Sequence, residues 1–587
     1  MTDTTRAITT DRFPFHDPAL SVQQRVDDLL SRMTLEDKAG LMFHEMTLIG
    51  NGLPGKPDPR AAIADLRVNH FSVLGTAHDA AELALWHNEL QQAAEQTGLG
   101  IPVSLSTDPR HAFTRNVGTT SDAGVFSQWP EPLGIAALRD PELARRFADI
   151  TRQEYLAAGL RVALHPQADL ATEPRWSRIL QTFGESAALA AELARVTIEG
   201  FRAGSVIGPD SVSCVVKHFP GAGPQKDGED PHFVYGKEQV YPGGRFEYHL
   251  QPFRVAVDAG VSQVMPYYGV PIGTAYDEVG FGFNRGILHD LLRGELGFEG
   301  VILSDFGLIH PSVIMGQSSP ARAWGVEHLS PSERVALAIQ AGVDQFGGES
   351  SSTLVVELVT SDVIAESRVD ESARRLLAEK FRLGLFDRRY VDVEHAVATI
   401  GRADFRGEGR AAQSAAIVRL TEAVDGPATL PISSAASVYT EGIDPTVASR
   451  LGTVVPDAES ADYAVLRLDA PYTARPGGFE SLFHAGSLDF GAEELGRIVR
   501  LCATTPTIIV IHLDRPAILN EIVDAAAAVL VEFGASDEAV IDVLTGEATA
   551  RGRLPFDIPS SMEAVVASDT DSPFDTENPS FRFGDGL

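Results

Sequence analysis

A lysine and a histidine stand together at the end of a β-branched run, and a long glycine- and proline-rich loop follows them. The run covers residues 211–216, the pair is Lys217 and His218, and the loop extends to Phe233. Ordering such a loop costs conformational entropy, so it usually has a functional task. Arginine takes almost every other basic position, and a compact ammonium suits hydrogen bonds to sugar hydroxyls, whereas arginine favours flat anions. The alternative is a structural Lys–His pair beneath the loop.

Two further polar side chains are suited to hold a sugar beside this pair. Asp108 follows the run at 101–106, and Arg178 ends the segment TEPRWSR. A sugar pocket needs carboxylates and basic groups that bind hydroxyls, together with two carboxyl groups at the bond to be cleaved. Trp176 would pack beneath such a pocket, unless its segment is an exposed loop.

The elements that must position these residues are short β-branched runs that alternate with amphipathic stretches between residues 100 and 350. This is the βαβ pattern of a parallel sheet or barrel. Residues 141–158, for example, carry Leu143, Phe147 and Ile150 on one face of a predicted helix. The repetition predicts a TIM-like (β/α)8 barrel.

Several of the runs end in polar residues. The runs at 261–265 and 301–304 lead to Tyr268 and Asp305, as the earlier ones lead to Asp108, Lys217 and His218. In a TIM-like barrel the carboxyl ends of the strands converge on the face that carries the active site. Each residue alone could be an ordinary surface residue, but their recurrence favours one shared site.

A second α/β pattern follows a charged, less periodic stretch. We predict a barrel over residues 1–388, a linker over 389–411 and a second domain over 412–587. The predicted strands of the second domain are 436–440, 463–468, 507–513 and 528–533, with a helix whose apolar positions are Leu495, Ile498, Val499 and Cys502. These strands are too few for a barrel, so an α/β/α sandwich is expected.

Composition limits the classes of partner. At 587 residues, with 44% apolar and 22% charged residues, the chain is long enough for two large folded domains. A net charge of −33 would repel nucleic acid or an anionic membrane surface, so a neutral small molecule is the expected partner. No P-loop, dinucleotide fingerprint or HExxH motif is present in a fitting context. We predict no metal and no cofactor.

Cys214 and Cys502 lie too far apart in sequence for a disulfide framework or a usual zinc site, and both are predicted to be buried thiols. The N-terminus (MTDTTRAITTDRF) has no basic stretch followed by an apolar one, and no run approaches the ~20 apolar residues of a membrane span. We expect a cytoplasmic protein, provided that no leader precedes the sequence as given. A homodimer is left open.

Segments in order along almost the whole chain resemble glycoside hydrolase family 3. They are MTLEDKAGLM, DPELARRF, EYLAAG, EPRWSR, KHFPGAG, VMPYY, GVILSDFG, KFRLGLFD, DVLTGEATARGRLPFDIP and FRFGDGL. Any one of these motifs is weak, but their ordered set is specific. The chain is therefore identified as a member of this family by resemblance.

The resemblance implies a TIM-like barrel followed by an α/β sandwich, without a fibronectin-like third domain. It implies a retaining, exo-acting β-glycosidase of the β-glucosidase kind, which cleaves by double displacement. Asp305 in LSDFG resembles the nucleophile, and Asp108 the carboxylate that grips the nonreducing-end sugar. The resemblance completes that sugar subsite with Arg178, Lys217, His218, Met265 and Tyr268.

The acid/base residue is where the chain departs most from the family. Many relatives have a glutamate shortly after a Pro-Tyr-Thr sequence, and Ala474 stands in that place here. The next glutamate is Glu480, between Phe479 and Phe483, whose apolar rings would favour the protonated form that a general acid needs. We expect Glu480 to act from the second domain, with an exposed loop glutamate as the alternative. Gln181 also replaces a glutamate that is often found there.

Other activities stay open on the same residues. Some relatives that cleave N-acetylglucosaminides use an Asp–His dyad on the loop after KHFPG, and Asp230 and His232 could form one here. Against this, the loop is longer than expected for the dyad, and those relatives often lack the second domain. Xylose is the next choice after glucose. A non-catalytic sugar-binding protein is a further alternative, against which Asp305 and the Lys217–His218 pair argue.

Overall fold

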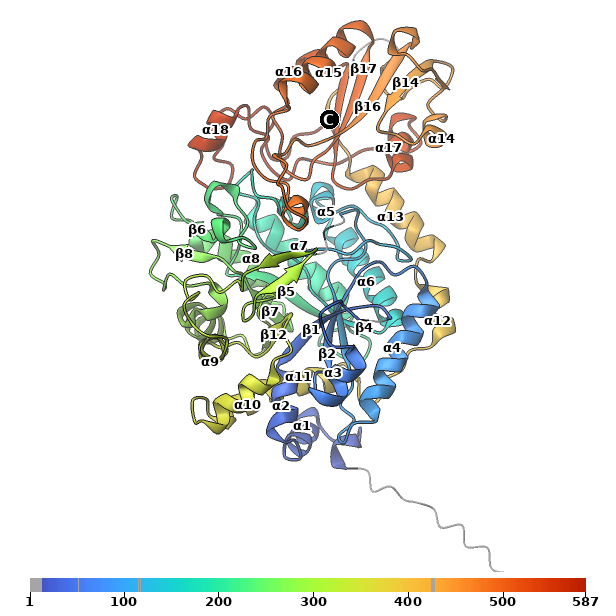
Figure 1. Ribbon diagram of the computed structural model, residues 1–587. Helices are drawn as coiled ribbons and strands as arrows, with labels where there is room; N and C mark the ends of the chain where they lie inside the picture. The colour runs from blue at the N-terminus through green and yellow to red at the C-terminus, as the bar shows by residue number, and fades with distance from the viewer. Residues whose placement is uncertain (1–12, 51, 115, 117, 424–427) are drawn as a thin grey trace, which may run out of the picture.

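The computed structural model describes residues 13–50, 52–114, 116, 118–423 and 428–587, and it contains two separate sheets with helices around them (Figure 1). Residues 1–12, on which the expectation about a leader depends, lie outside the described residues. None of the described helices is both long and apolar enough to cross a membrane.

The first sheet has eight parallel strands and closes on itself. In spatial order they are β12 (Phe346–Gly347), β1 (Phe43–Leu48), β2 (His70–Leu74), β3 (Ser104–Thr107), β4 (Leu160–Ala163), β5 (Ser213–Phe219), β7 (Gln263–Pro266) and β9 (Val301–Ile302). A parallel bridge between Leu303 and Gln345 joins the two ends of this order. The predicted TIM-like barrel is confirmed.

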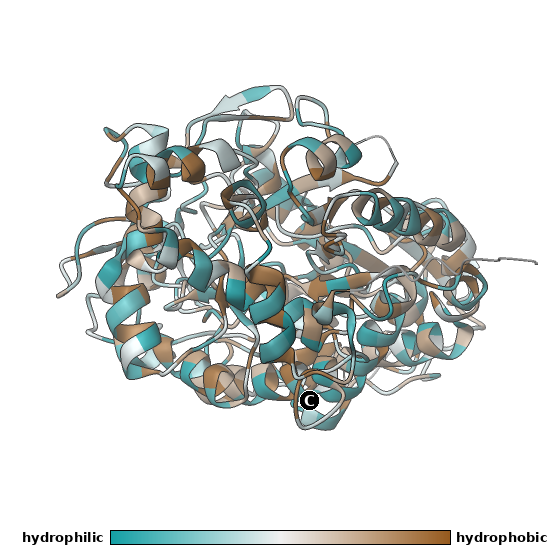
Figure 2. Ribbon diagram, turned by 90° about the horizontal axis from the view of Figure 1, so that it is seen from below, coloured by the Kyte–Doolittle hydropathy of each residue, from teal (hydrophilic) through white to brown (hydrophobic). Residues whose placement is uncertain are grey.

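Helices surround the barrel, and apolar residues gather toward its interior while the outer helices mix polar and apolar residues (Figure 2). The main helices are α1 (Val22–Leu30), α2 (Leu35–Leu41), α3 (Pro59–Asp65), α4 (Ala80–Glu95), α5 (Pro132–Leu138), α6 (Pro141–Ala158), α7 (Ala187–Arg202), α8 (Phe246–Asp258), η6 (Gly286–Glu295), α9 (Pro331–Ala341), α10 (Ser352–Thr360) and α11 (Glu366–Arg382). Two small sheets, β6 (Glu238–Val240) with β8 (Val270–Ile272) and β10 (Ser312–Ile314) with β11 (Gln317–Ser319), lie outside the barrel order.

Helix α6 shows why local sequence sets an element's bounds. The Asp140 side chain accepts a hydrogen bond from Leu143 N, Pro141 occupies the first turn, and Gly159 ends the helix with φ of 77°. These are the residue types that start and stop helices. Of the predicted inward positions Ile150 is buried, whereas Leu143 and Phe147 are half-buried.

The predicted linker is more ordered than its composition indicates. Helices α12 (Val393–Thr399) and α13 (Ala403–Ala416) occupy most of residues 389–411. Helix α12 packs on α4 and α6, and α13 contacts both α5 of the barrel and α17 (Asp537–Leu544) of the second domain. Ala396, Phe405 and Ala412 are buried in these contacts. Burial of these few apolar residues therefore makes the connection a packed one.

The second sheet is mixed. Its order is β13 (Val418–Thr421), β18 (Ala528–Glu532), β17 (Thr507–His512), β16 (Tyr463–Asp469), β14 (Ser437–Glu441) and β15 (Thr453–Val454), and only the β13–β18 pair is antiparallel. Helices α15 (Ala492–Thr504) and α16 (Asn520–Ala525) lie on a different side of the sheet from α14 (Pro445–Ala448) and α17 (Figure 1). On α15 only Ile498 is buried.

The two cysteines differ from each other. Cys214 is buried in the barrel, as predicted, but the side chain of Cys502 is only half-buried. The expectation of a buried thiol was wrong for Cys502, because it lies on α15, where only Ile498 is buried and Cys502 packs partly against the core.

Candidate active site

Asp305 follows β9 at the carboxyl end of the barrel and has two unlike oxygens. Its Oδ1 accepts hydrogen bonds from Tyr268 Oη at 2.8 Å and from Phe306 N at 2.8 Å. Its buried Oδ2 has no hydrogen-bond partner among the described residues. A buried unpaired carboxylate oxygen is unfavourable, so such an atom is usually kept for a task. One oxygen is held in place and the other is available to attack a ligand.

His218 is held as a neutral ring beside Asp305. Its Nδ1 lies 2.7 Å from Asp169 Oδ2, and its backbone N donates to Asp169 Oδ1 at 3.0 Å. Arg178 Nη1 can only donate, so His218 Nε2, at 3.2 Å, accepts and the ring proton sits on Nδ1. Burial, together with the charges of Arg178 and Lys217, holds the His218 pKa well below its usual range. The 3.8 Å approach of His218 Nε2 to Asp305 Oδ2 is therefore not an ion pair.

Neutral amides surround the guanidinium of Arg178. Its Nε donates to Gln181 Oε1 at 3.0 Å and its Nη2 to Gln167 Oε1 at 2.9 Å. Burial would lower its pKa, but nearby acidic groups such as Asp230 and Asp305 raise it above the usual value. Arg178 thus keeps its positive charge for the carboxylates that face it across the site.

The amide of Gln181 bridges two groups. Besides accepting from Arg178, its Nε2 donates to Thr119 Oγ1 at 2.8 Å. A glutamate at this position could not donate, so the departure from the family pattern at Gln181 has a local structural role.

The remaining predicted sugar-binding residues fall into two groups. Lys217 Nζ donates to Asp108 Oδ1 at 2.7 Å, so these two strand-end residues pair directly. Lys217 also lines a cavity of about 50 Å³, together with Gln167 and Gln181. Met265 instead packs among apolar side chains inside the barrel, including Val215 and Leu303.

Asp230 and His232, on the loop after β5, form a second hydrogen-bonded pair in the site. His232 Nδ1 lies 2.6 Å from Asp230 Oδ1, and Asp230 Oδ2 accepts from Trp176 Nε1 and Tyr267 Oη, both at 3.0 Å. Burial would raise the Asp230 pKa, but His232 and Arg178 lower it to about 2. Burial also lowers the His232 pKa despite the Asp230 charge. Trp176 is buried beneath the site rather than on an exposed loop.

The loop that carries Glu480 reaches the barrel from the second domain. Glu480 begins the short helix η8 (Glu480–Leu482), is half-buried, and accepts a hydrogen bond from Tyr235 Oη at 2.8 Å. The buried rings of Phe479 and Phe483 have centroids 6.1 and 5.0 Å from the His232 ring. The predicted apolar surroundings thus form around His232, whereas the Glu480 carboxylate points to a tyrosine.

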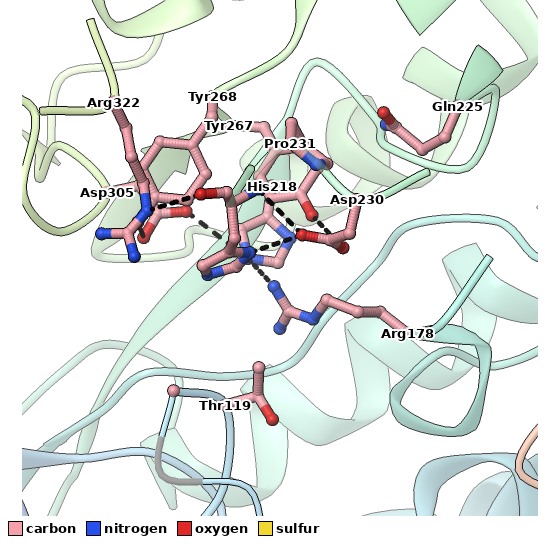
Figure 3. A network of polar contacts seen from close by, with 12 residues as sticks. Thr119, Arg178, His218, Gln225, Asp230, Pro231, Tyr267, Tyr268, Asp305 and Arg322 are labelled. Atoms are coloured by element: carbon pink, nitrogen blue, oxygen red, sulfur yellow. Dashed lines mark hydrogen bonds and ion pairs between the residues drawn. The ribbon is translucent and has the colours of Figure 1, made fainter. Parts of the chain in front are cut away.

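Arg322 is a site residue that sequence reasoning missed. Its Nη1 donates to Phe306 O at 3.0 Å, its Nε donates to His232 O at 3.3 Å, and its guanidinium lies 5.3 Å from the centre of the Tyr268 ring. Figure 3 shows it beside Asp305, with Arg178 beside His218 on the other side of the network. Arg322 follows no barrel strand directly, so strand-end spacing could not reveal it. Gln167 and Asp169, in the segment after β4, and Tyr267, directly after β7, were also missed, although their strand-end position is a signal that could have found them.

No group of three or more histidine, cysteine, aspartate or glutamate side chains in the described part of the chain is arranged to hold a metal ion. The cluster instead combines an unpaired carboxylate, charged hydrogen-bond donors and a buried Asp–His pair. Such a set suits hydroxyl binding and attack on an electrophilic carbon.

Comparison with known proteins identifies the family of the chain. The model for the glycosyl hydrolase family 3 N terminal domain matches residues 52–378, and the model for the C-terminal domain matches residues 326–587. The probable beta-glucosidase C of Aspergillus flavus is 49% identical and covers 98% of this chain and 91% of its own. The periplasmic beta-glucosidase/beta-xylosidase of Dickeya chrysanthemi is 41% identical with the same coverage, 98% and 91%. A solved b-glucosidase from Erythrobacter marinus has the same fold, with a TM-score of 0.80, 20% identity, and coverage of 98% of this chain and 84% of its own.

Proposed function

This chain belongs to glycosyl hydrolase family 3, and from that membership we propose that it is a retaining, exo-acting β-glucosidase. Relatives at 49% and 41% identity are named for β-glucosidase activity, the second also for β-xylosidase activity. The substrate is a small glycoside or oligosaccharide with β-D-glucose at its nonreducing end. The main structural support for the proposal is the Asp305 carboxylate, in which Oδ1 accepts hydrogen bonds and Oδ2 has no hydrogen-bond partner among the described residues.

In the proposed reaction Asp305 Oδ2 attacks the anomeric carbon of the terminal sugar. The bond to the leaving-group oxygen breaks as the bond to Oδ2 forms, and a covalent glycosyl-enzyme results. Tyr268 Oη and Phe306 N hold Oδ1, so the carboxylate needs little rearrangement before attack. Water then displaces Asp305, and two inversions give net retention.

The terminal sugar is proposed to lie against Asp108, Lys217, Arg178 and His218. The Lys217 ammonium has three N–H donors and uses one in its hydrogen bond to Asp108, so the other two can bind hydroxyl oxygens of the sugar. Asp108 can accept from a hydroxyl with its second oxygen. Arg178 and His218 complete this face next to the nucleophile.

We propose Glu480 as the acid/base, with His232 as the competing residue. Glu480 belongs to the loop that the second domain extends to the barrel, and a carboxylic acid is the usual proton donor to a glycosidic oxygen. His232 has its own support, since Nδ1 is occupied by Asp230 while Nε2 makes no hydrogen bond within the described residues. Mutation of each residue in turn separates these two roles.

The activity is tested with aryl β-glycosides of glucose, xylose and N-acetylglucosamine, with the anomer of the first product followed by NMR. Fastest turnover of the β-glucoside with release of β-glucose supports the proposal. An initial α-anomer would contradict the retaining mechanism. Glucose binding without turnover of any glycoside would favour a sugar-binding protein, and preference for the N-acetylglucosaminide would assign the substrate differently.

A cytoplasmic location and a homodimer are further proposals, to be tested by cell fractionation and by light scattering of the purified protein. The Dickeya chrysanthemi relative is named as a periplasmic enzyme, so fractionation should include a periplasmic fraction.

A further inference from the structure

Segment 471–486 of the second domain is a closed loop that extends to the barrel (Figure 1). Thr473 N donates to Ala485 O at 2.8 Å, which brings the two ends of the loop together. Next to this neck, a Cβ on Gly486 would lie 2.3 Å from Thr473 Oγ1, so only glycine fits there. Phe479 and Phe483 at the tip pack against His232.

Arg515, just after β17, connects both ends of this loop to the barrel. Its Nη2 donates to Pro471 O at 2.7 Å, and its Nη1 donates to Gly486 O at 3.3 Å and to Arg175 O of the barrel at 3.0 Å. The side chain is fully buried. Within the described residues no carboxylate forms a hydrogen bond with it, and Asp514 Oδ1 approaches its Nε only to 4.0 Å. Its hydrogen bonds all go to main-chain carbonyls, so the guanidinium fixes the position of the loop backbone relative to the barrel.

The neighbouring residue holds the same part of the loop. Asp514 Oδ2 lies 2.5 Å from His484 Nδ1, and the His484 ring stacks on Tyr472 with centroids 3.8 Å apart. The tip has its own contacts with the barrel, from Asn116 Nδ2 to Leu482 O at 2.9 Å. Arg515, however, binds both ends of the loop and a barrel carbonyl with a single guanidinium.

We propose that Arg515 is a positioning residue of the active site, which sets loop 471–486 so that the proton donor meets the leaving-group oxygen. The inference rests on the proposed glycosidase function. It holds whichever group donates the proton. Glu480 is itself on the loop, and His232 packs against Phe479 and Phe483 of the loop, so a displaced loop would move either group. A displacement of about 1 Å at a reacting group can cost about 10²-fold in rate.

The test compares Arg515→Gln and Arg515→Lys with the wild type on a series of aryl β-glucosides. Arg497→Gln is the control, because Arg497 on α15 pairs with Glu441 of β14 and with Glu494 of its own helix rather than with the loop. Rates are divided by the concentration of active sites, titrated with a fluorinated glucoside that traps the covalent intermediate, and Tm is measured separately.

We expect Arg515→Gln to lose about 10²-fold in kcat/KM on poor leaving groups and less than about 10-fold on a dinitrophenyl glucoside, which needs little protonation. Arg515→Lys should recover part of the loss because an ammonium can still reach a carbonyl. If kcat/KM per active site falls equally on all substrates, or does not fall, the inference is overturned. The proposed function is not affected by that result, as long as the wild type hydrolyses the glucosides. If Arg515→Gln does not fold, Arg515→Lys must still show the leaving-group dependence. A wild type without any glycosidase activity overturns the proposed function and this inference together.

Discussion

The ring of His232 lies 4.9 Å, centre to centre, from the ring of Tyr268, and the hydroxyl of that tyrosine donates to Asp305. The Asp230–His232 pair and the nucleophile therefore share one aromatic neighbour. Arg322 strengthens the connection, since it binds the main-chain carbonyls of both His232 and Phe306. The two loops that carry the reactive groups are thus joined at the side chain and at the backbone.

The acid/base assignment predicts different substrate profiles for Glu480→Ala and His232→Ala. If Glu480 donates the proton, its alanine variant should keep much of its glycosylation rate on a dinitrophenyl glucoside and lose activity on poor leaving groups. Azide should then give a β-glycosyl azide from the covalent intermediate. Equal losses on good and poor leaving groups, without azide product, would move the role to His232. Glu493→Ala, on the exposed start of α15, is the control.

Removal of the nucleophile should abolish the first chemical step. Asp305→Ala is expected to lose on the order of 10³-fold or more in kcat, because the covalent bond to the sugar cannot form. Azide should restore turnover in this variant and yield an α-glycosyl azide, identified by NMR. Near-normal kcat would exclude Asp305 from the covalent step.

The sugar-binding assignment predicts weaker binding without the Asp108 carboxylate. Asp108→Ala removes the partner of Lys217 and leaves a hydroxyl unpaired, which costs about 1–3 kcal/mol, or about 5- to 150-fold in affinity. Glucose inhibition and kcat/KM should both weaken. If neither changes, Asp108 does not contact the sugar. Thermal unfolding of the variant shows whether loss of the ion pair alone lowers stability.

Stability between the domains should depend on pH through Glu185. This barrel residue accepts hydrogen bonds from the backbone of Asp557 and Phe574, and burial, with the Asp557 charge adding to it, raises its pKa to about 8. A pKa raised above the ordinary 4.5 gives stability that is fully present below pH 4.5 and is lost as pH rises through 8.

This dependence is measured as the difference in unfolding free energy between wild type and Glu185→Gln from pH 5 to pH 9. The wild type should lose stability relative to the variant as pH rises, by at most about 1.4 kcal/mol per pH unit. Glu192→Gln, on the exposed side of α7, is the control and should show no such trend. A constant difference across the range would contradict the raised pKa.

Local sequence determined the elements and the residues at their ends. The spacing of Leu143, Phe147 and Ile150 predicted a helix over residues 141–158, which are the observed bounds of α6. The ends of β-branched runs likewise marked Asp108, Lys217, His218, Tyr268 and Asp305. Parallel strands in a barrel bring their carboxyl ends to one face, so these five residues, from four strand ends far apart in sequence, could be assigned to one site.

Only the tertiary structure decided which of these groups are paired, neutral or free. Asp169 lies 49 positions before His218, and Arg515 binds a carbonyl 340 positions away, at distances that no spacing rule covers. The direction of the Glu480 carboxylate depends on Tyr235 from another domain, and the buried state of Asp305 Oδ2 depends on everything packed around it. Periodicity reports the face on which a residue lies. Hydrogen-bond partners and desolvation arise from contacts between distant segments, which exist only after the chain has folded.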